Sequence, residues 1–272
     1  MIRDLEYPDD ARKVINELHE RLKYDAAISV LGLASAKLEL KEGTQPDFST
    51  GIRYGGRIED EAVRRDAAGL LSRFSLISMV SHIEQHAQLL LLQRRVIEEM
   101  VSTGQRLDSK SMWKILRGVH KDSLSGPVKL CSELVVKEPS IELASKMNWL
   151  DGIVRVRNCL AHRLGYVQMQ DVRSGKPIEE IKDSDTLKAI WLRLKVSDNG
   201  KVIETFPHIS SGKGFDYTFE EFKREWRIGD HIDVTPEECQ AIGISLALLA
   251  NQLLDDFERE INIFLSSTNP SF

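Results

Sequence analysis

The sequence predicts an all-α protein, a helical bundle with one small β-hairpin insertion. Three observations predict this class. Apolar residues recur every three or four positions over most of the chain, as they do along one face of a helix. Strict alternation of apolar and polar residues marks one short region, 190–196, and predicts a strand there. Glycine and proline separate many of the helical stretches from one another.

Two long helices are expected in the first part of the chain. The first covers 10–40 and is followed by a loop at 43–56, where glycine and proline accumulate. The second covers 59–101, with a break tolerated near Gly69. Its run Leu89-Leu90-Leu91-Leu92 predicts burial on more than one side, in the core or in a subunit interface.

Shorter helices are expected at 109–120, 127–136 and 140–164, with Trp113 and Leu116 of the first one facing inward. Gly165 stands just past the last of them, where helix C-termini prefer glycine. The strand at 190–196 is then followed by Asp198-Asn199-Gly200, a strong hairpin turn, and 201–206 would be the returning strand.

A closing helix is expected near the C-terminus. Thr235-Pro236-Glu237-Glu238 has the pattern of a capping box with proline at the first helical position, and an apolar stripe follows it. The chain therefore divides into an N-terminal helical segment (1–50), a helical core (51–165), the hairpin insertion (166–232) and a closing helix packed on the core (233–272).

Composition indicates a cytoplasmic protein without a membrane segment. A chain of 272 residues can bury a core without disulfides or a structural metal. Its three cysteines are scattered and form no CxxC pair, which supports neither a disulfide framework nor a zinc site. The charged N-terminus does not resemble a signal peptide. No apolar stretch approaches the roughly 20 residues that span a bilayer.

The distribution of charge matters more than its total. A formal charge of −5 argues against a basic nucleic-acid coat protein. The acidic cluster Asp255-Asp256-x-Glu258 is expected to be a solvated face. Residues 145–165, however, carry four cations (Lys146, Arg155, Arg157, Arg163) against Asp151, a local charge of +3. A phosphate site in this segment is compatible with an acidic whole.

The segment Arg157-Asn158-Cys159-Leu160-Ala161-His162 carries the chemistry. A histidine can shuttle a proton near neutral pH, an arginine can brace a phosphate oxygen, and an asparagine can orient either one. None of them needs a metal. Together they suit cleavage of RNA, where the neighbouring 2′-hydroxyl supplies the nucleophile.

Helix geometry limits this interpretation. Asn158 and His162 share a face, but Arg157 and His162 are separated by about 140° on an ideal helix. They converge if the helix end loosens at His162, if the arginine side chain wraps round, or if a second copy supplies a partner.

The motif Arg157-Asn158-x-x-Ala161-His162 resembles the R-x4-6-H motif of the HEPN superfamily. The resemblance implies a compact helical domain that forms a homodimer, with two copies of the motif building one site at the dimer cleft. It also implies a metal-independent endoribonuclease of a toxin–antitoxin or phage-defence system, with Arg157 and His162 as the catalytic pair and Asn158 as polar support. The expected partners are RNA and, as a separate chain, an antitoxin or regulatory protein; no cofactor is expected.

Two other functions remain open at this stage. The first is a non-catalytic HEPN-like module for binding or dimerisation, which the overall acidity and the insertion favour mildly. The second is a helical interaction protein whose long N-terminal helix docks a partner. Under either, the motif is a polar helix end, with His162 near the negative end of the helix dipole.

Other conspicuous residues have plainer interpretations. His82 and His86 have the spacing of metal ligands, but no third ligand is evident, so a partly exposed helix face is expected. Ser210-Ser211-Gly212-Lys213-Gly214 lacks the phosphate-loop pattern and is expected to be a plain loop. Cys159 has no base to activate it and is expected to be a small buried residue.

Overall fold

In the computed structural model of the chain, the described residues are 7–37, 61–123, 126–134, 141–172, 182, 185–198, 201–203 and 216–268. They form a mainly helical protein with a small antiparallel sheet, which confirms the predicted class at that level. The helices are α1 (Tyr7–Lys37), α2 (Glu61–Thr103), α3 (Ser109–Ser123), α4 (Pro127–Leu134), α5 (Ile141–His162), α6 (Met169–Val172) and α7 (Pro236–Thr268). The strands are β1 (Thr186–Asp198), β2 (Lys201–Ile203) and β3 (Asp216–Arg227).

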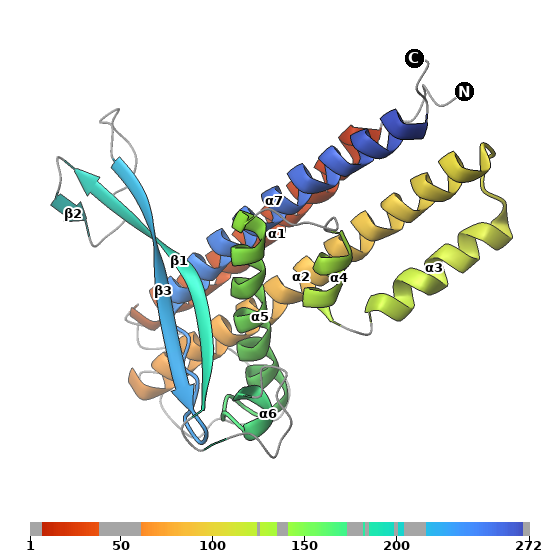
Figure 1. Cartoon of the computed structure of the whole chain (residues 1–272). Helices are drawn as coiled ribbons and strands as arrows, with labels where there is room; N and C mark the ends of the chain where they lie inside the picture. The colour runs from red at the N-terminus through yellow and green to blue at the C-terminus, as the bar shows by residue number, and fades with distance from the viewer. Residues whose placement is uncertain are drawn as a thin grey trace, which may run out of the picture.

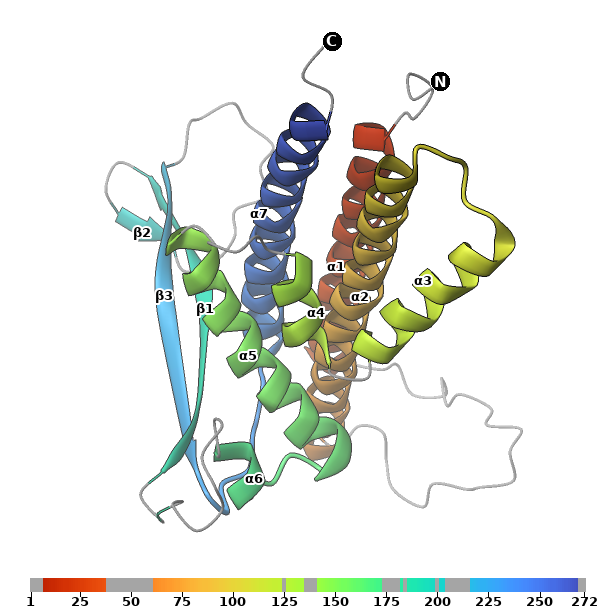
Figure 2. The same cartoon turned by 45° about the vertical axis from the view of Figure 1, so that its right-hand side comes forward.

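Three long helices, α1, α2 and α7, form the centre of the molecule (Figures 1 and 2). α1 runs antiparallel to α7, as two contacts along their length show: Arg12 pairs with Glu258 at 2.8 Å, and the ring of His19 lies 3.3 Å from the carbonyl oxygen of Ala247. The helices pack through the apolar stripes that the sequence displays. On α1 the buried face is Ala11, Ile15, Leu18 and Leu22.

α2 is one uninterrupted helix that continues through Gly69, although the sequence prediction allowed a break there. A glycine inside a helix lowers its stability without breaking it when tertiary contacts hold both sides. The leucine run is not buried uniformly: Leu90 and Leu91 are buried, Leu92 is half-buried and Leu89 is exposed. The upper part of α2 carries α3 and α4 at its side (Figure 2).

α5 lies between the three long helices and the sheet (Figure 2). Gly152 permits this, because a Cβ at that position would lie 2.8 Å from the Cα of Ala189 and 3.0 Å from the carbonyl oxygen of Lys188. The buried face of β1 against which the helices pack is Leu187, Ala189 and Trp191. The backbone of α5 at Gly152 therefore packs directly against the backbone of β1. This contact positions α5, and with it the C-terminal end of the helix.

The sheet has the strand order β2-β1-β3 and is antiparallel throughout. The expected pairing of β1 with the strand after the turn is present over three residue pairs, from Val196–Ile203 to Asp198–Lys201. The turn residues Asn199 and Gly200 lie outside the described residues, as do the loops expected at 43–56 and 210–214.

The larger pairing, β1 with β3, was missed by the sequence prediction. It covers twelve residue pairs, from Thr186–Arg227 to Ser197–Asp216. In β3 the aromatic residues Phe219, Phe222 and Trp226 are three and four positions apart, a helical rather than an alternating spacing. The insertion is thus a long two-stranded ribbon with a short third strand, instead of a simple hairpin.

The closing helix begins as predicted. The backbone N–H of Glu238 donates to Oγ1 of Thr235 at 3.2 Å, and the N–H of Thr235 donates to Oε2 of Glu238 at 3.0 Å. These reciprocal bonds define a capping box. Glu238 also accepts a hydrogen bond from Arg224 of β3 at 2.5 Å, so the same carboxylate ties α7 to the sheet.

None of the three cysteines forms a disulfide, and all are fully buried: Cys131 in α4, Cys159 in α5 and Cys239 in α7. They lie on three different helices of the core. Sγ of Cys239 donates to the carbonyl oxygen of Ser72 at 3.1 Å. Among the helices described, none is both long enough and apolar enough to cross a membrane.

Candidate functional site

The candidate site is the C-terminal end of α5. The helix ends where Leu164 and Gly165 adopt left-handed conformations, with φ of 55° and 88°. The N–H groups of Arg163 and Gly165 both donate to the carbonyl oxygen of Cys159, at 2.9 and 3.2 Å, and so satisfy the last turn. A Cβ at 165 would also lie 3.1 Å from Nε2 of His231, a tight contact that adds to the preference of this positive φ for glycine.

Arg157 and Asn158 are in direct contact. Nη1 of Arg157 donates to the amide oxygen of Asn158 at 2.9 Å, and Nη2 lies 3.5 Å from Oγ of Ser81 on α2. Ser81 in turn donates to the carbonyl oxygen of Ile77 at 2.9 Å. The guanidinium is therefore held between its own helix and α2 by two neutral groups.

His162 is not part of this contact. It is the last residue of α5, its side chain is exposed, and it makes no hydrogen bond or ion pair with the described part of the chain. Because α5 stays helical through His162, the separation of about 140° from Arg157 is maintained within one chain. Of the three residues of the motif, the structure brings Arg157 and Asn158 together and leaves His162 open to solvent.

The cations of residues 145–165 differ in whether a carboxylate of the described residues pairs with them. Arg155 pairs with Asp151 at 2.8 Å, and Arg163 pairs with the buried carboxylate of Asp171 at 2.7 Å. Lys146 is buried and donates to Gln252 of α7 at 3.3 Å. Arg157 has no carboxylate partner among the described residues. Its charge is the one in this segment that remains available to an anionic ligand.

Cys159 lies inside the motif but is not available for chemistry. Its side chain is fully buried, and burial together with the nearby negative charge of Asp171 raises the pKa of the thiol to about 11. The thiol therefore stays protonated at neutral pH, which agrees with the prediction of a small buried residue.

Apolar side chains surround the end of α5 on its outer side. Leu164, Tyr166 and Met169 are 77%, 56% and 45% exposed. The ring of Tyr166 contacts that of His231 edge-on at 4.9 Å, and His231 lies 3.3 Å from Nη2 of Arg73 on α2. Exposed apolar side chains and polar side chains therefore occur together around the segment that follows α5.

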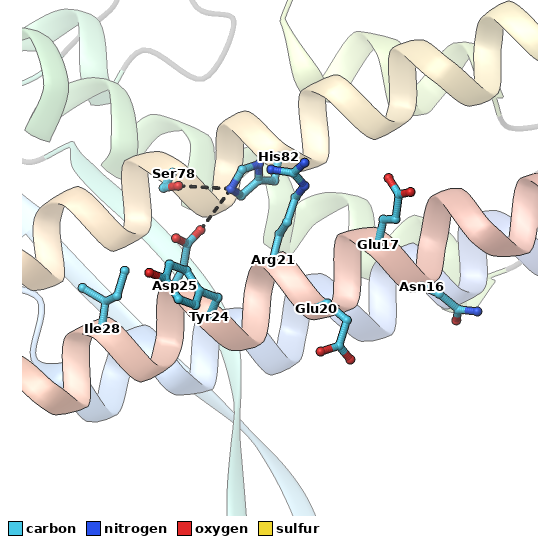
Figure 3. A pocket seen from close by; sticks show the side chains of 9 residues that line it. All are labelled: Asn16, Glu17, Glu20, Arg21, Tyr24, Asp25, Ile28, Ser78 and His82. Carbon is cyan, nitrogen blue, oxygen red and sulfur yellow. Dashed lines mark hydrogen bonds and ion pairs between the residues drawn. The ribbon is translucent and has the colours of Figure 1, made fainter.

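A second polar cluster lies in a groove of about 860 Å³ between α1 and α2 (Figure 3). Nε2 of His82 is 3.2 Å from Oγ of Ser78 and 3.5 Å from Oδ2 of Asp25. Burial raises the pKa of Asp25, against the lowering effects of Ser78 and His82, and burial lowers the pKa of His82. The serine and the carboxylate face the same ring nitrogen, so the cluster lacks the relay of a Ser-His-Asp triad, which uses both nitrogens.

The expectation for the two histidines of α2 is correct for His82 and wrong for His86. His82 is partly exposed, whereas His86 is 2% exposed, with Nδ1 donating to the carbonyl oxygen of His82 at 2.7 Å. Burial lowers the pKa of His86. The hydrogen bond within the helix satisfies the ring and allows it to be buried. No group of three or more His, Cys, Asp or Glu side chains that could hold a metal occurs among the described residues.

Sequence reasoning did not identify Ser81 as the partner of Arg157 or Asp25 as the partner of His82. Both contacts join residues that are more than fifty positions apart, and no local pattern marks either one. Comparison of the chain with family models, with curated proteins and with solved structures gives no match, so the resemblance to the HEPN superfamily rests on the residues of the motif at the end of α5.

Proposed function

We propose that the chain is a HEPN-like, metal-independent endoribonuclease of the toxin–antitoxin or phage-defence type. The observation that carries the proposal is the environment of Arg157: its guanidinium is held by Asn158 and Ser81, and it has no carboxylate partner among the described residues. An arginine fixed in this way is preorganised for a phosphate.

The proposed chemistry needs only groups of the protein. The 2′-hydroxyl of RNA attacks the adjacent phosphorus while the 5′-oxygen of the next nucleotide leaves, and His162 moves the proton as general acid or base. Arg157 stabilises the charge that develops on the phosphate oxygens. Asn158 keeps the guanidinium in place through the bond at 2.9 Å.

The site is proposed to be shared by two copies of the chain in a homodimer. His162 and Arg157 do not meet within one chain, and His162 is exposed at the helix end beside Leu164, Tyr166 and Met169. Burial of these apolar side chains against a second copy would provide a driving force for association. The proposal requires that this dimer place His162 of one copy beside Arg157 of the other.

The test is incubation with single-stranded and structured RNA in EDTA. The wild type is expected to cleave, and His162→Ala and Arg157→Ala are each expected to lose roughly a hundredfold or more in rate. Arg155→Ala, which removes an ion-paired arginine of the same helix, serves as the matched control and should cleave normally. A mixture of the two inactive variants should regain cleavage. Cleavage that survives His162→Ala would remove the proposed role of this residue.

A second candidate is a non-catalytic HEPN-like module for binding or dimerisation. It is favoured by one observation: two donors of Arg157 are already engaged within its own chain. Under this function the purified protein shows no nuclease activity at any enzyme concentration, and His162→Ala leaves dimerisation unchanged. The cleavage assay separates the two functions, and sedimentation of wild type and His162→Ala shows whether a dimer forms and survives the substitution.

A further inference from the structure

α3 carries a stripe of cations on its outward face. Lys110, Lys114, Arg117 and Lys121 follow one another at intervals of four, three and four residues. At 100° per residue their side chains fall within a sector of about 60°. All four are exposed, and none forms an ion pair with the described part of the chain. In a chain whose net charge is −5, this is a concentrated positive surface.

The face of α3 opposite the cations packs against the rest of the protein and fixes the orientation of the helix. Val119 is buried, and Ile115 packs against the core. Nη2 of Arg95 on α2 pairs with Asp122 at 2.5 Å, and Gly118 makes room for this arginine, because a Cβ at 118 would lie 2.8 Å from its Nη1. The carboxylate of Asp122 is therefore committed to α2 and does not neutralise the stripe.

An aromatic side chain stands beside these cations. The sequence prediction that Trp113 and Leu116 face inward is wrong, because the buried face of α3 is formed around Val119 and leaves Trp113 64% and Leu116 37% exposed. Trp113 lies one turn before Arg117 on the edge of the stripe. All four tryptophans belong to the described residues, and the other three, Trp149, Trp191 and Trp226, are buried. An exposed tryptophan among unpaired cations matches the needs of single-stranded nucleic acid, whose phosphates require positive charge and whose bases stack on aromatic rings.

We propose that this stripe, Lys110, Trp113, Lys114, Arg117 and Lys121, is a docking surface for single-stranded RNA. A membrane surface fits the stripe less well, because a membrane-binding helix needs a broad exposed apolar face. On α3 the large exposed apolar side chains are Trp113 and Leu116. The inference rests on the proposed ribonuclease function and extends it: the stripe binds the substrate strand outside the cleavage site.

The position of α3 sets the length of RNA that can use both surfaces. Arg95, which holds the C-terminal end of α3, and Ser81, which contacts Arg157, are fourteen residues apart on α2. That distance is about 21 Å of helix axis. At the spacing of roughly 3.4 Å for each nucleotide of a stacked strand, an RNA needs at least about six nucleotides to span this axial distance. A shorter RNA reaches one surface at a time.

The test compares two triple variants of equal charge change. K110Q/K114Q/K121Q removes three cations of the stripe, and K188Q/K195Q/K223Q removes three lysines of the sheet, which lies on the other side of the molecule (Figure 2). With an RNA of about twenty nucleotides, the stripe variant is expected to bind roughly tenfold more weakly, and the slope of log K against log salt should fall by about 2. The sheet variant should bind like the wild type.

Two further measurements complete the test. RNA should quench the fluorescence of the exposed Trp113, and Trp113→Phe should remove that signal because the remaining tryptophans are buried. Cleavage of an RNA of about four nucleotides should be equal in the stripe variant and the wild type.

If no cleavage occurs at all, the proposed ribonuclease function fails. RNA binding and fluorescence quenching then still show whether the stripe is a docking surface for RNA. Equal RNA binding by both triple variants would overturn the docking surface, as would stripe-dependent binding to phosphatidylserine vesicles without RNA binding.

Discussion

The amide oxygen of Asn158 accepts a hydrogen bond from Nη1 of Arg157 at 2.9 Å. This contact joins neighbours in sequence, so it turns the asparagine toward the arginine rather than toward His162, four residues on. Asn158 is thus a positioning residue for the guanidinium. The proposed function depends on that guanidinium keeping both its orientation and its uncompensated charge.

Asn158→Asp is therefore expected to damage RNA binding more than Asn158→Ala. The aspartate keeps the acceptor and the shape of the side chain, but its negative charge pairs with Arg157 and competes with phosphate. Alanine removes one hydrogen bond and leaves the charge of Arg157 available, with a loss of roughly fivefold to tenfold. RNA affinity is the measurement, with thermal unfolding as the check on folding. A purely structural role for Asn158 would give the reverse order, because the aspartate is the closer replacement.

Gly152→Ala is expected to destabilise the protein by about 1–3 kcal/mol, since the new methyl group would meet the backbone of β1 at Ala189. Gly69→Ala is the matched control, because a Cβ at 69 has nothing within 4 Å. Replacing this helical glycine should stabilise the protein by about 0.5–1 kcal/mol. Urea denaturation measures both values. Equal effects of the two substitutions would contradict the close contact of α5 with β1.

Acid is expected to destabilise the protein through the two histidines of α2. Burial lowers the pKa of His82 and of His86 below the ordinary value of 6.5, so folding favours their neutral forms. Stability from this source is complete above about pH 6.5 and is lost as the pH falls through the lowered values. His86→Asn keeps a donor for the carbonyl oxygen of His82 but cannot titrate. Its unfolding free energy should fall less between about pH 7.5 and pH 5 than that of the wild type; an unchanged pH slope would argue against this origin.

Asp25→Asn is expected to stabilise the protein at neutral pH. Burial raises the pKa of this carboxyl despite Ser78 and His82, so the folded state disfavours its ionised form. The stability that the protonated form contributes is present below the unfolded pKa and is lost as the pH rises through the raised value. Asparagine fits the same space without the charge. Thermal unfolding of both proteins should show the larger gain for Asn at about pH 7.5 and a smaller one at about pH 4.

The helices were predicted well because their signals are local. The capping box of Thr235 and Glu238 lies within four consecutive residues. Gly165, which follows α5, adopts the positive φ that favours glycine at the end of a helix. The end of α2 at Thr103 and the beginning of α3 at Ser109 lie within a few residues of their predicted positions for the same reason.

Features that depend on tertiary contact were not predictable in this way. β3 has a helical spacing of aromatic residues, and its pairing with β1 over twelve residues overrides that pattern. His86 is buried by the packing of neighbouring elements on α2, and the hydrogen bond from Nδ1 to the carbonyl oxygen of His82 compensates for that burial. The residues of the motif were identified from the sequence, but the partner Ser81 is seventy-six positions away from Arg157.

The three buried thiols, Cys131, Cys159 and Cys239, are intrinsic reporters of local opening. Each is inaccessible in the folded chain, so a thiol reagent modifies it only when its own helix detaches or the whole molecule unfolds. Mass spectrometry of the labelled peptides would rank α4, α5 and α7 by their opening free energies. The rate at Cys159, which lies between Arg157 and His162, would measure directly how often the end of α5 comes apart.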